Sequence, residues 1–218
     1  MIKLKIWGDF ACFTRPEMKV ERVSYDVITP SAARGILEAI LWKPEMRWVI
    51  REIEVLNPIQ WANIRRNEVG KKIPIAGKTG VTAAMKKASG TLGMFIEEER
   101  QQRASLLLKQ VAYIIHADIE LTAKAPQGEK NTKYRCMFKR RVNKGQCFHP
   151  PYFGCREFPV NFSAVDGSEK ALNDSRELGW MLYDLDYSGK EVTPQFFNAN
   201  MCKGKIQIPD RNSQEVVR

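Results

Sequence analysis

The stretch LLLKQVAYIIHADIEL, residues 106–121, decides how the chain is expected to fold. It is dense in apolar side chains and rich in β-branched ones, a composition that favours a strand over a helix. Its 16 residues exceed the length of most strands. We therefore predict one long strand that bends along its course.

Strand and helix patterns alternate on both sides of this strand. Residues 3–14 alternate polar and apolar side chains, and Gly8 marks a point where another part of the backbone approaches closely. A helix is expected to begin at Pro30 with Thr29 as its N-cap, and Lys43-Pro44 ends its pattern. The remaining predicted elements are a strand at 48–59, an insertion with a mobile basic loop at 61–101, a helix at 133–144 ended by Gly145, and a strand at 156–165.

This order of strands and helices predicts an α+β fold. The series β, α, β, insertion, β, α, β is the ferredoxin-like pattern that RNA-recognition modules share. We assign it to an N-terminal RNA-binding domain spanning residues 1–165. Three short strands at 180–187, 195–203 and 205–208, joined by turns, predict a small antiparallel β subdomain at 178–210.

Composition narrows the class of protein. The chain has 218 residues, and none of its apolar runs approaches the roughly 20 residues that cross a bilayer. Neither a membrane partner nor a secretion signal is expected. Five cysteines, an odd number without a Cys-x-x-Cys pair, argue against zinc and for a reducing, cytoplasmic location. We expect no metal and no cofactor.

Charge points to a polyanionic partner. The net charge is +10 and the isoelectric point is near 9.4, although such an excess also serves solubility alone. The positive charge is densest in the helix predicted at 133–144. Few carboxylates lie near it, since the acidic residues between Asp118 and Glu157 are only Glu120 and Glu129. At about 100° per residue, Lys133, Arg140 and Lys144 share one stripe, next to an apolar stripe of Tyr134, Phe138 and Val142. One face is thus expected to meet phosphates, unless the lysines and arginines simply form a solvated surface.

Several motifs in and around this helix resemble one family. They are MFKRR at 137–141, GQCFH at 145–149 and YFGCREFP at 152–159, supported by WGDFACFT at 7–14, WKP at 42–44 and GWMLYDLD at 179–186. Together they resemble the CRISPR-associated Cas5 family, subtype I-C. The resemblance implies an endoribonuclease that cleaves the repeat hairpin of precursor crRNA and stays on the 5′ handle, with the other subunits of the type I-C interference complex as partners.

Cleavage of RNA without a metal requires the 2′-OH to attack its own phosphate, which leaves a 2′,3′-cyclic phosphate. Proton transfer and stabilisation of the phosphorane then fall to His, Lys and Tyr side chains. The resemblance implies a Tyr directly before Trp-Lys-Pro and a Lys-His pair at the start of the basic helix. Lys133 matches, whereas Leu41 and Tyr134 replace the other two residues. We expect Tyr134 to serve as acid or base, with a pKa lowered by the surrounding cations, unless its ring belongs to the core like Phe138. We expect His149 to supply a proton relay, unless it only caps the turn before Pro150 and Pro151.

Further residues are assigned to RNA binding or to structure. The predicted RNA-binding cations are Arg34, Lys43, Arg140, Arg141, Lys144 and Arg156. Asp184 and Asp186 are expected on a solvent face, His116 is expected to be structural, and no convergent carboxylate cluster is expected. The alternatives are a subunit that holds the handle without cutting it, and nonspecific binding of duplex DNA.

Overall fold

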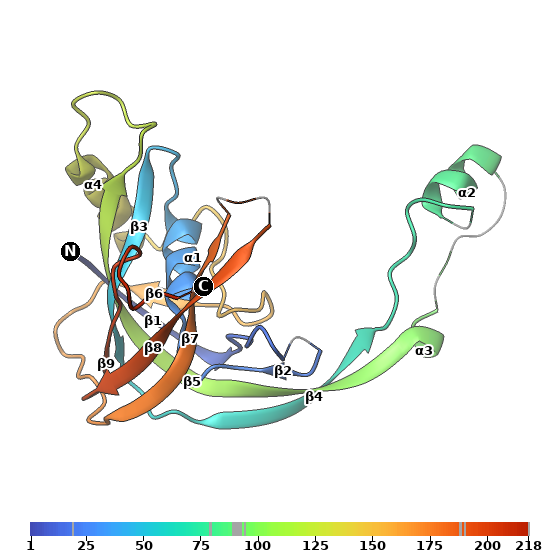
Figure 1. The fold of residues 1–218 in the computed structure, drawn as a ribbon, viewed down its shortest axis with the longest axis horizontal. Helices are drawn as coiled ribbons and strands as arrows, with labels where there is room; N and C mark the ends of the chain where they lie inside the picture. Colours follow the sequence, from blue (N-terminus) through green and yellow to red (C-terminus); the bar gives the residue numbers. More distant parts are fainter. Residues whose placement is uncertain are drawn as a thin grey trace. The chain divides into compact units, whose positions relative to one another are not determined.

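The structure, a computed structural model, describes residues 1–18, 20–78, 80–88, 93, 95–187, 189 and 191–217. The chain forms two compact units (Figure 1). The main unit comprises Met1–Ala62 and Leu106–Arg218, and the second unit comprises Asn63–Ser105. Each unit is described by itself.

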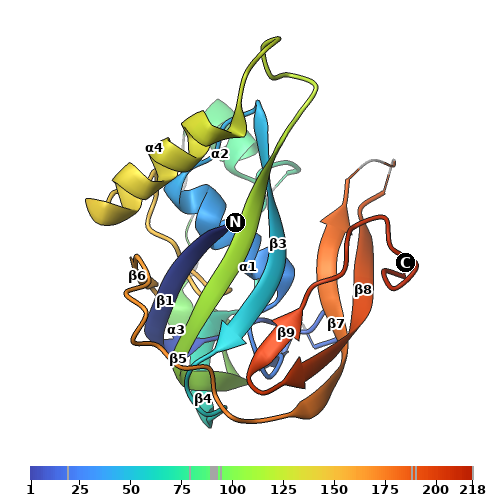
Figure 2. The ribbon, with the colours of Figure 1, turned by 90° about the vertical axis from the view of Figure 1, so that its left-hand side faces the viewer.

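The main unit is built on an antiparallel sheet whose strand order is β6-β1-β5-β3-β9-β8-β7, with β2 also paired to β5. Figure 2 shows β1, β5 and β3 side by side with α1 behind them. The predicted long strand is confirmed and begins earlier than expected, at Arg100. The strands of this sheet are β1 (Ile2–Ala11), β2 (Arg22–Val23), β3 (Met46–Val55), β5 (Arg100–Leu121), β6 (Asn161–Ser163), β7 (Arg176–Asp186), β8 (Thr193–Cys202) and β9 (Lys205–Gln207).

The alternation predicted for residues 3–14 is present in β1. Leu4 and Ile6 are fully buried, whereas Lys3 and Trp7 are exposed. The close approach predicted at Gly8 is also present, because a Cβ there would lie 2.9 Å from the Pro159 carbonyl oxygen. This strand therefore contributes one face to the core.

The predicted first helix is confirmed as α1 (Pro30–Ile40). The Thr29 hydroxyl accepts a hydrogen bond from the Ala32 N–H at 3.3 Å, and Pro30 occupies the first turn, where a missing N–H costs nothing. α1 packs against both β3 and β7. Its buried residues are Pro30, Ala33, Ile36, Leu37, Ala39 and Ile40.

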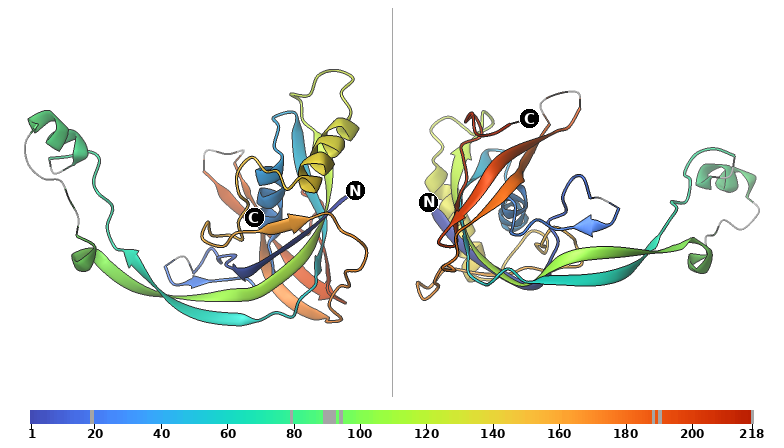
Figure 3. Two further views of the ribbon diagram at one scale, coloured as in Figure 1. Left: turned by 180° about the vertical axis from the view of Figure 1, so that it is seen from behind. Right: turned by 60° about the horizontal axis from the view of Figure 1, so that its bottom comes forward.

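The predicted second helix is confirmed as α4 (Asn131–Asn143), and Gly145 follows it with a φ of +62°. Figure 3 shows α4 beside α1. The strand predicted at 156–165 is mostly wrong, because β6 comprises only Asn161–Ser163. The backbone before it bonds within its own loop instead: the Phe153 N–H donates to the Phe158 carbonyl at 2.8 Å, and the Val160 N–H donates to the Pro151 carbonyl at 3.0 Å.

The three short strands predicted near the C-terminus are confirmed as β7, β8 and β9. β9 pairs with β3 through Ile53 and Ile206, so these strands continue the main sheet. The α+β class predicted from the sequence is thus confirmed in its coarse form, as a mixture of helices and strands with an antiparallel sheet. Of the helices that the structure describes, none is long and apolar enough to span a bilayer.

The second unit holds more regular structure than predicted. β4 (Trp61–Val69), which starts just before it, pairs with β5, and two short helices, α2 (Val81–Lys87) and α3 (Ile96–Glu99), lie between them in sequence. The insertion at 61–101 was predicted to hold a mobile basic loop, and its first nine residues form a strand that was not predicted. The strand alternates exposed and half-buried residues, but the half-buried set includes Arg66 and Glu68, which form an ion pair at 3.1 Å. Because charged residues occupy half-buried positions of this strand, its sequence does not alternate between polar and apolar residues.

Candidate nucleic-acid interface

Helix α4 presents opposite faces to the core and to solvent. Tyr134, Phe138 and Val142 are buried, and the Phe138 ring packs edge-on against Trp48 with ring centres 4.8 Å apart. The predicted cationic stripe is exposed on the opposite side. It consists of Lys133, Arg140 and Lys144.

The cations of α4 differ in whether the protein already neutralises them. The Lys133 ammonium forms an ion pair with Glu129 at 2.9 Å, and the Arg135 guanidinium forms one with Asp118 at 3.1 Å. The Arg141 guanidinium donates to the Ile40 carbonyl. Three other cations of α4 and its C-cap have no side-chain hydrogen bond or ion pair in the described part of the chain. The unpartnered cations are Lys139, Arg140 and Lys144. They remain available for an anionic ligand.

Lys133 and Tyr134 lie together in the first turn of α4. The Lys133 Nζ is 5.5 Å from the centre of the Tyr134 ring. Burial raises the pKa of the Tyr134 hydroxyl, and the charges of Glu129 and Glu45 raise it further, against the lowering effect of Lys133. The expectation of a lowered pKa is wrong, because only 3% of the side chain is exposed.

Two carboxylates near this pair were not predicted. The hydrogen bond from Lys133 lowers the pKa of Glu129 and, reciprocally, raises the pKa of Lys133. Glu45 acts on Lys133 and Tyr134 through its charge, and its Oε2 is buried without a hydrogen-bond partner among the described residues. The spacing of Glu129 and Lys133, four residues apart, is the sequence signal that would have revealed the first of these contacts.

The C-terminal end of α1 is joined to α4 and to the loop after it. The carbonyls of residues 39–41 would otherwise lack partners, as at any helix end. Each accepts a hydrogen bond from a distant part of the chain: the backbone N–H groups of Phe148 (2.8 Å) and His149 (3.3 Å), the Arg141 guanidinium, and the Trp48 indole (2.8 Å). Arg141, predicted to bind RNA, thus also fixes α1.

Leu41, which stands where the resemblance implies a reactive tyrosine, is completely buried. The two residues after it are exposed, Trp42 by 59% of its surface, and Lys43 has no ion pair among the described residues. Across the joint, Phe148 is 81% exposed. An aromatic ring and a free cation therefore follow the end of α1, and a second ring lies on the segment bound to it.

His149 is not brought into contact with Lys133 or Tyr134. Its Nδ1 lies 3.3 Å from the Pro150 carbonyl oxygen, and its ring stands 6.0 Å from that of Phe148. Lys133 lies in the first turn of α4 and Asn143 ends the helix, a rise of about 15 Å along the axis between them, and His149 follows beyond that end. Only two of the three predicted catalytic residues lie together.

The loop formed by residues 152–159 contacts the residues that follow β1. The Cys12 N–H donates to the Phe153 carbonyl at 3.1 Å, and the Phe153 ring packs edge-on against Phe13 at 6.0 Å. Gly154 has a φ of +77°, and a Cβ there would lie 1.9 Å from the Cys12 carbonyl oxygen. Arg156, a predicted RNA-binding residue, is exposed and has no ion pair in the described structure.

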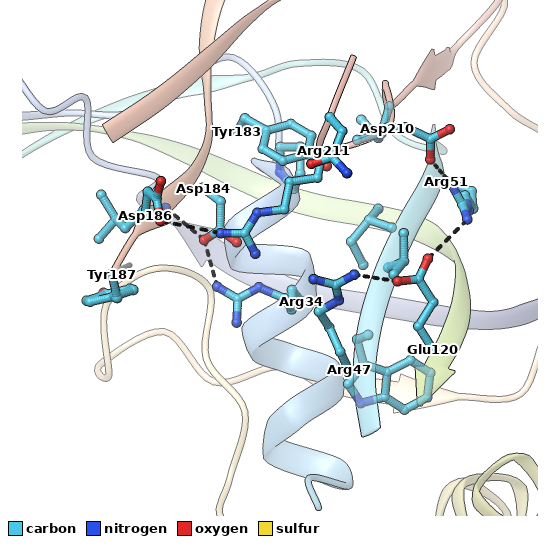
Figure 4. A pocket seen from close by; sticks show the side chains of 17 residues that line it. Arg34, Arg47, Arg51, Glu120, Tyr183, Asp184, Asp186, Tyr187, Asp210 and Arg211 are labelled. Carbon is cyan, nitrogen blue, oxygen red and sulfur yellow. Dashed lines mark hydrogen bonds and ion pairs between the residues drawn. The ribbon is translucent and has the colours of Figure 1, made fainter. Parts of the chain in front are cut away.

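Arg34, another predicted RNA-binding residue, lines a cavity of about 700 Å³ between α1, β3, β7 and the residues after β9 (Figure 4). Its guanidinium binds Asp184 at 2.7 Å and Glu38 at 2.8 Å. The other arginines of this cavity, Arg47, Arg51 and Arg211, are also paired with carboxylates. The expectation that Asp184 and Asp186 lie on a solvent face is wrong, since Asp186 is only 7% exposed.

A convergent carboxylate cluster, which the sequence analysis did not expect, lies on β3 and β5. Glu52, Glu54 and His116 hold potential ligand atoms within 4.8 Å of one another, and the His116 Nε2 is 2.6 Å from Glu54. The Lys205 ammonium lies within 3.7 Å of both carboxylates. A cation of the chain therefore already offsets part of the negative charge that would attract a metal ion.

Comparisons with known proteins agree with the motifs. A family model described as CRISPR-associated protein (Cas_Cas5) matches residues 1–209. A protein of Mannheimia succiniciproducens named CRISPR pre-crRNA endoribonuclease Cas5d is 52% identical over 225 residues, covering 100% of this chain and 98% of the relative. A protein of Thermus thermophilus with the same name is 42% identical over 235 residues, with coverages of 100% and 95%.

Solved structures agree in fold. A functionally uncharacterized protein from Streptococcus mutans superimposes with a TM-score of 0.68 at 19% identity, covering 100% of this chain and 96% of that one. A structure described as a CRISPR-associated protein gives a TM-score of 0.70 at 19% identity, with the same coverages.

Proposed function

Because this chain belongs to the CRISPR-associated Cas5 family, subtype I-C, we propose that it is a metal-independent endoribonuclease acting on the repeat hairpin of precursor crRNA. After cleavage it remains on the 5′ handle, within the type I-C interference complex. The carrying observation is the exposed face of α4, where Arg140 and Lys144 have no partner among the described residues. Lys133 on this face lies beside the buried Tyr134.

The reaction requires one bond to form at phosphorus and one to break. The 2′ oxygen bonds to phosphorus as its proton passes to water, and the bond to the 5′ oxygen breaks as that oxygen takes a proton. Tyr134, whose raised pKa keeps it protonated at neutral pH, suits the donation to the 5′ oxygen. Lys133 suits stabilisation of the phosphorane charge. His149, beyond the far end of α4, is assigned a contact with RNA.

Cleavage of a labelled repeat hairpin in EDTA tests this proposal. The expected products carry a 2′,3′-cyclic phosphate and a 5′-OH. Lys133→Ala and Tyr134→Phe are expected to slow cleavage strongly, whereas Tyr187→Phe, a change in an exposed tyrosine on another part of the main unit, leaves it unchanged. A 3′-OH product, or cleavage that requires a divalent metal, would contradict the mechanism. Glu52, Glu54 and His116 would then be the candidate metal ligands.

A subunit that binds the handle without cutting is the second candidate. The buried Leu41 favours it, because leucine cannot exchange a proton where the family resemblance implies a tyrosine. Tight binding of the hairpin with no product under any metal condition would establish this role. Nonspecific binding of duplex DNA through the same cations remains part of the proposal, and competition by unrelated DNA measures it.

The finer fold assignment belongs to the same proposal. Four neighbouring strands of the sheet lie in the spatial order β6-β1-β5-β3. Numbered among themselves along the chain, they give the order 4-1-3-2 of a ferredoxin-like sheet, which supports such a fold. We retain residues 1–165 as the RNA-binding and nuclease domain and 178–210 as its β subdomain. Five free cysteines accord with action in the reducing cytoplasm.

A further inference from the structure

Two exposed aromatic rings border the unpartnered cations of α4. Phe148 is 81% exposed and Trp42 is 59% exposed. Burying a phenylalanine side chain typically stabilises a protein, so a ring left in water forgoes that gain. Neither ring has an aromatic partner from the core within the described structure, although Phe148 stands 6.0 Å from the equally exposed His149.

The backbone that carries Phe148 is nevertheless held firmly. The Phe148 N–H donates to the Ala39 carbonyl at 2.8 Å, and the Gln146 N–H donates to the Arg141 carbonyl at 2.9 Å. Trp42 follows Ala39 by three residues. Both rings therefore project from backbone fixed at the joint between α1 and α4, and a fixed ring loses little conformational entropy on binding a ligand.

We propose that Trp42 and Phe148 form a stacking platform for unpaired nucleotides of the bound RNA, a few nucleotides from the cleaved bond. This inference rests on the proposed function and adds a binding subsite to it. Aromatic faces stack on any base, and the phosphates that accompany each base need neighbouring cations. Lys43 and Lys144, both unpartnered in the described residues, lie one and four positions from the rings in sequence.

Charge favours RNA over a protein partner on this surface. An aromatic patch that docks a protein is usually depleted of charge at its centre. Here an unpartnered cation of the described structure, Lys43, directly follows Trp42 in sequence, and another, Lys144, precedes Phe148 by four positions. The nearest following carboxylate, Glu45, has one oxygen buried. A polyanion is therefore the better match.

The geometry also limits which nucleotides reach the platform. The segment from Ala39 to Glu45 connects the Phe148 loop with the Lys133–Tyr134 pair, since Glu45 is near enough to act on both through its charge. The helix rises about 15 Å from Lys133 to Asn143, and Phe148 follows five residues after that end. Stacked nucleotides rise about 3.4 Å each, so the platform meets bases within about four nucleotides of the cleaved bond.

Fluorescence of 2-aminopurine tests the platform. The probe replaces one unpaired nucleotide at a time on either side of the repeat hairpin. If the wild-type protein cleaves the hairpin, a 2′-deoxy sugar at the cleaved position blocks the reaction. Stacking on Trp42 or Phe148 is expected to quench the probe at positions within about four nucleotides of the cut. Phe148→Leu and Trp42→Leu are each expected to abolish quenching at one such position and to weaken hairpin binding about 5- to 150-fold.

Matched variants separate stacking from loss of bulk. Phe148→Tyr and Trp42→Phe keep a ring and are expected to retain the quenching. Trp180→Leu removes a ring of similar exposure, 56%, from β7 and is expected to change nothing. If the wild-type protein binds or cleaves the hairpin but both leucine variants quench like it, the platform is wrong and the proposed function stands. If the wild-type protein does not bind the hairpin, both the platform and the proposed function are wrong.

Discussion

The Nζ of Lys133 lies 5.5 Å from the centre of the Tyr134 ring. A cation at this distance favours the ionised tyrosine, but burial of the side chain outweighs it, and the pKa of Tyr134 is raised. The lysine remains charged because its hydrogen bond to Glu129 raises its own pKa. The pair thus offers a proton donor and a cation at neutral pH, as a departing 5′ oxygen and a crowded phosphate require.

A pH series of cleavage rates tests the protonation state of Tyr134. The ratio of the wild-type rate to the Tyr134→Phe rate is expected to be about 10² to 10⁴. It should stay constant from neutral pH to about pH 10, the ordinary tyrosine pKa, because the raised pKa keeps the donor protonated. It then declines as the hydroxyl ionises. A ratio that grows with pH would instead identify tyrosinate as a base.

Removing Glu129 is expected to release Lys133 for RNA. Glu129→Gln eliminates the carboxylate that holds the lysine pKa up, so that pKa falls toward its ordinary value. Since an ion pair on the surface is weak, hairpin binding at pH 7 should tighten only slightly, by about fivefold or less. Fluorescence anisotropy across a pH series measures both effects, with Glu177→Gln on β7 as a control. Weaker binding would show instead that Glu129 positions the lysine.

Chemical footprinting can locate the RNA on α4. Cys136 is exposed on this helix between Lys133 and Arg140, and Cys202 is exposed on β8. Bound hairpin should protect Cys136 from alkylation and leave Cys202 as reactive as in the free protein. Mass spectrometry of the labelled peptides measures both sites in one sample. Equal labelling of Cys136 with and without RNA would exclude this face of the helix.

Sequence reasoning succeeded where the cause is local and failed where it is distant. The Thr29 cap and Pro30 define the start of α1 from neighbouring residues alone, and the buried stripe of α4 follows from helical spacing. The partner of Arg34 lies 150 positions away at Asp184, and Glu54 meets His116 across two strands. No periodicity records such contacts, so the sequence did not reveal that carboxylates of the chain already pair with Arg34.

Replacing Gly154 tests the backbone contact that supports the loop after α4. Gly154→Ala places a Cβ 1.9 Å from the Cys12 carbonyl oxygen at a φ of +77°. Gly128→Ala is the matched control, since its φ is +82° and no atom lies within 4 Å of its Cβ. The control should cost about 1–2 kcal/mol for the left-handed backbone, and Gly154→Ala about 3 kcal/mol or more. Urea unfolding measures the difference in the free energy of unfolding. Equal costs for the two variants would mean that the backbone at Cys12 and Gly154 moves apart easily to make room for the Cβ.

Arg34 and Arg140 should separate a structural arginine from an RNA-binding one. Arg34→Gln leaves Asp184 and Glu38 without their cation, and the side chains of Arg34 and Asp184 are only 28% and 15% exposed. After allowance for that exposure, the loss is about 2 kcal/mol, or a Tm lower by about 4–8 °C. Salt dependence of hairpin binding should not change.

Arg140→Gln is expected to do the reverse, because this side chain is exposed and has no partner in the described structure. Its Tm should match that of the wild type, while the slope of log K against log[salt] decreases by about 0.7–0.9 for one lost phosphate contact. Thermal melts and binding at several salt concentrations on both variants give the comparison. A reduced slope for Arg34→Gln would mean that RNA draws this arginine away from Asp184, and the cavity of Figure 4 would then belong to the interface.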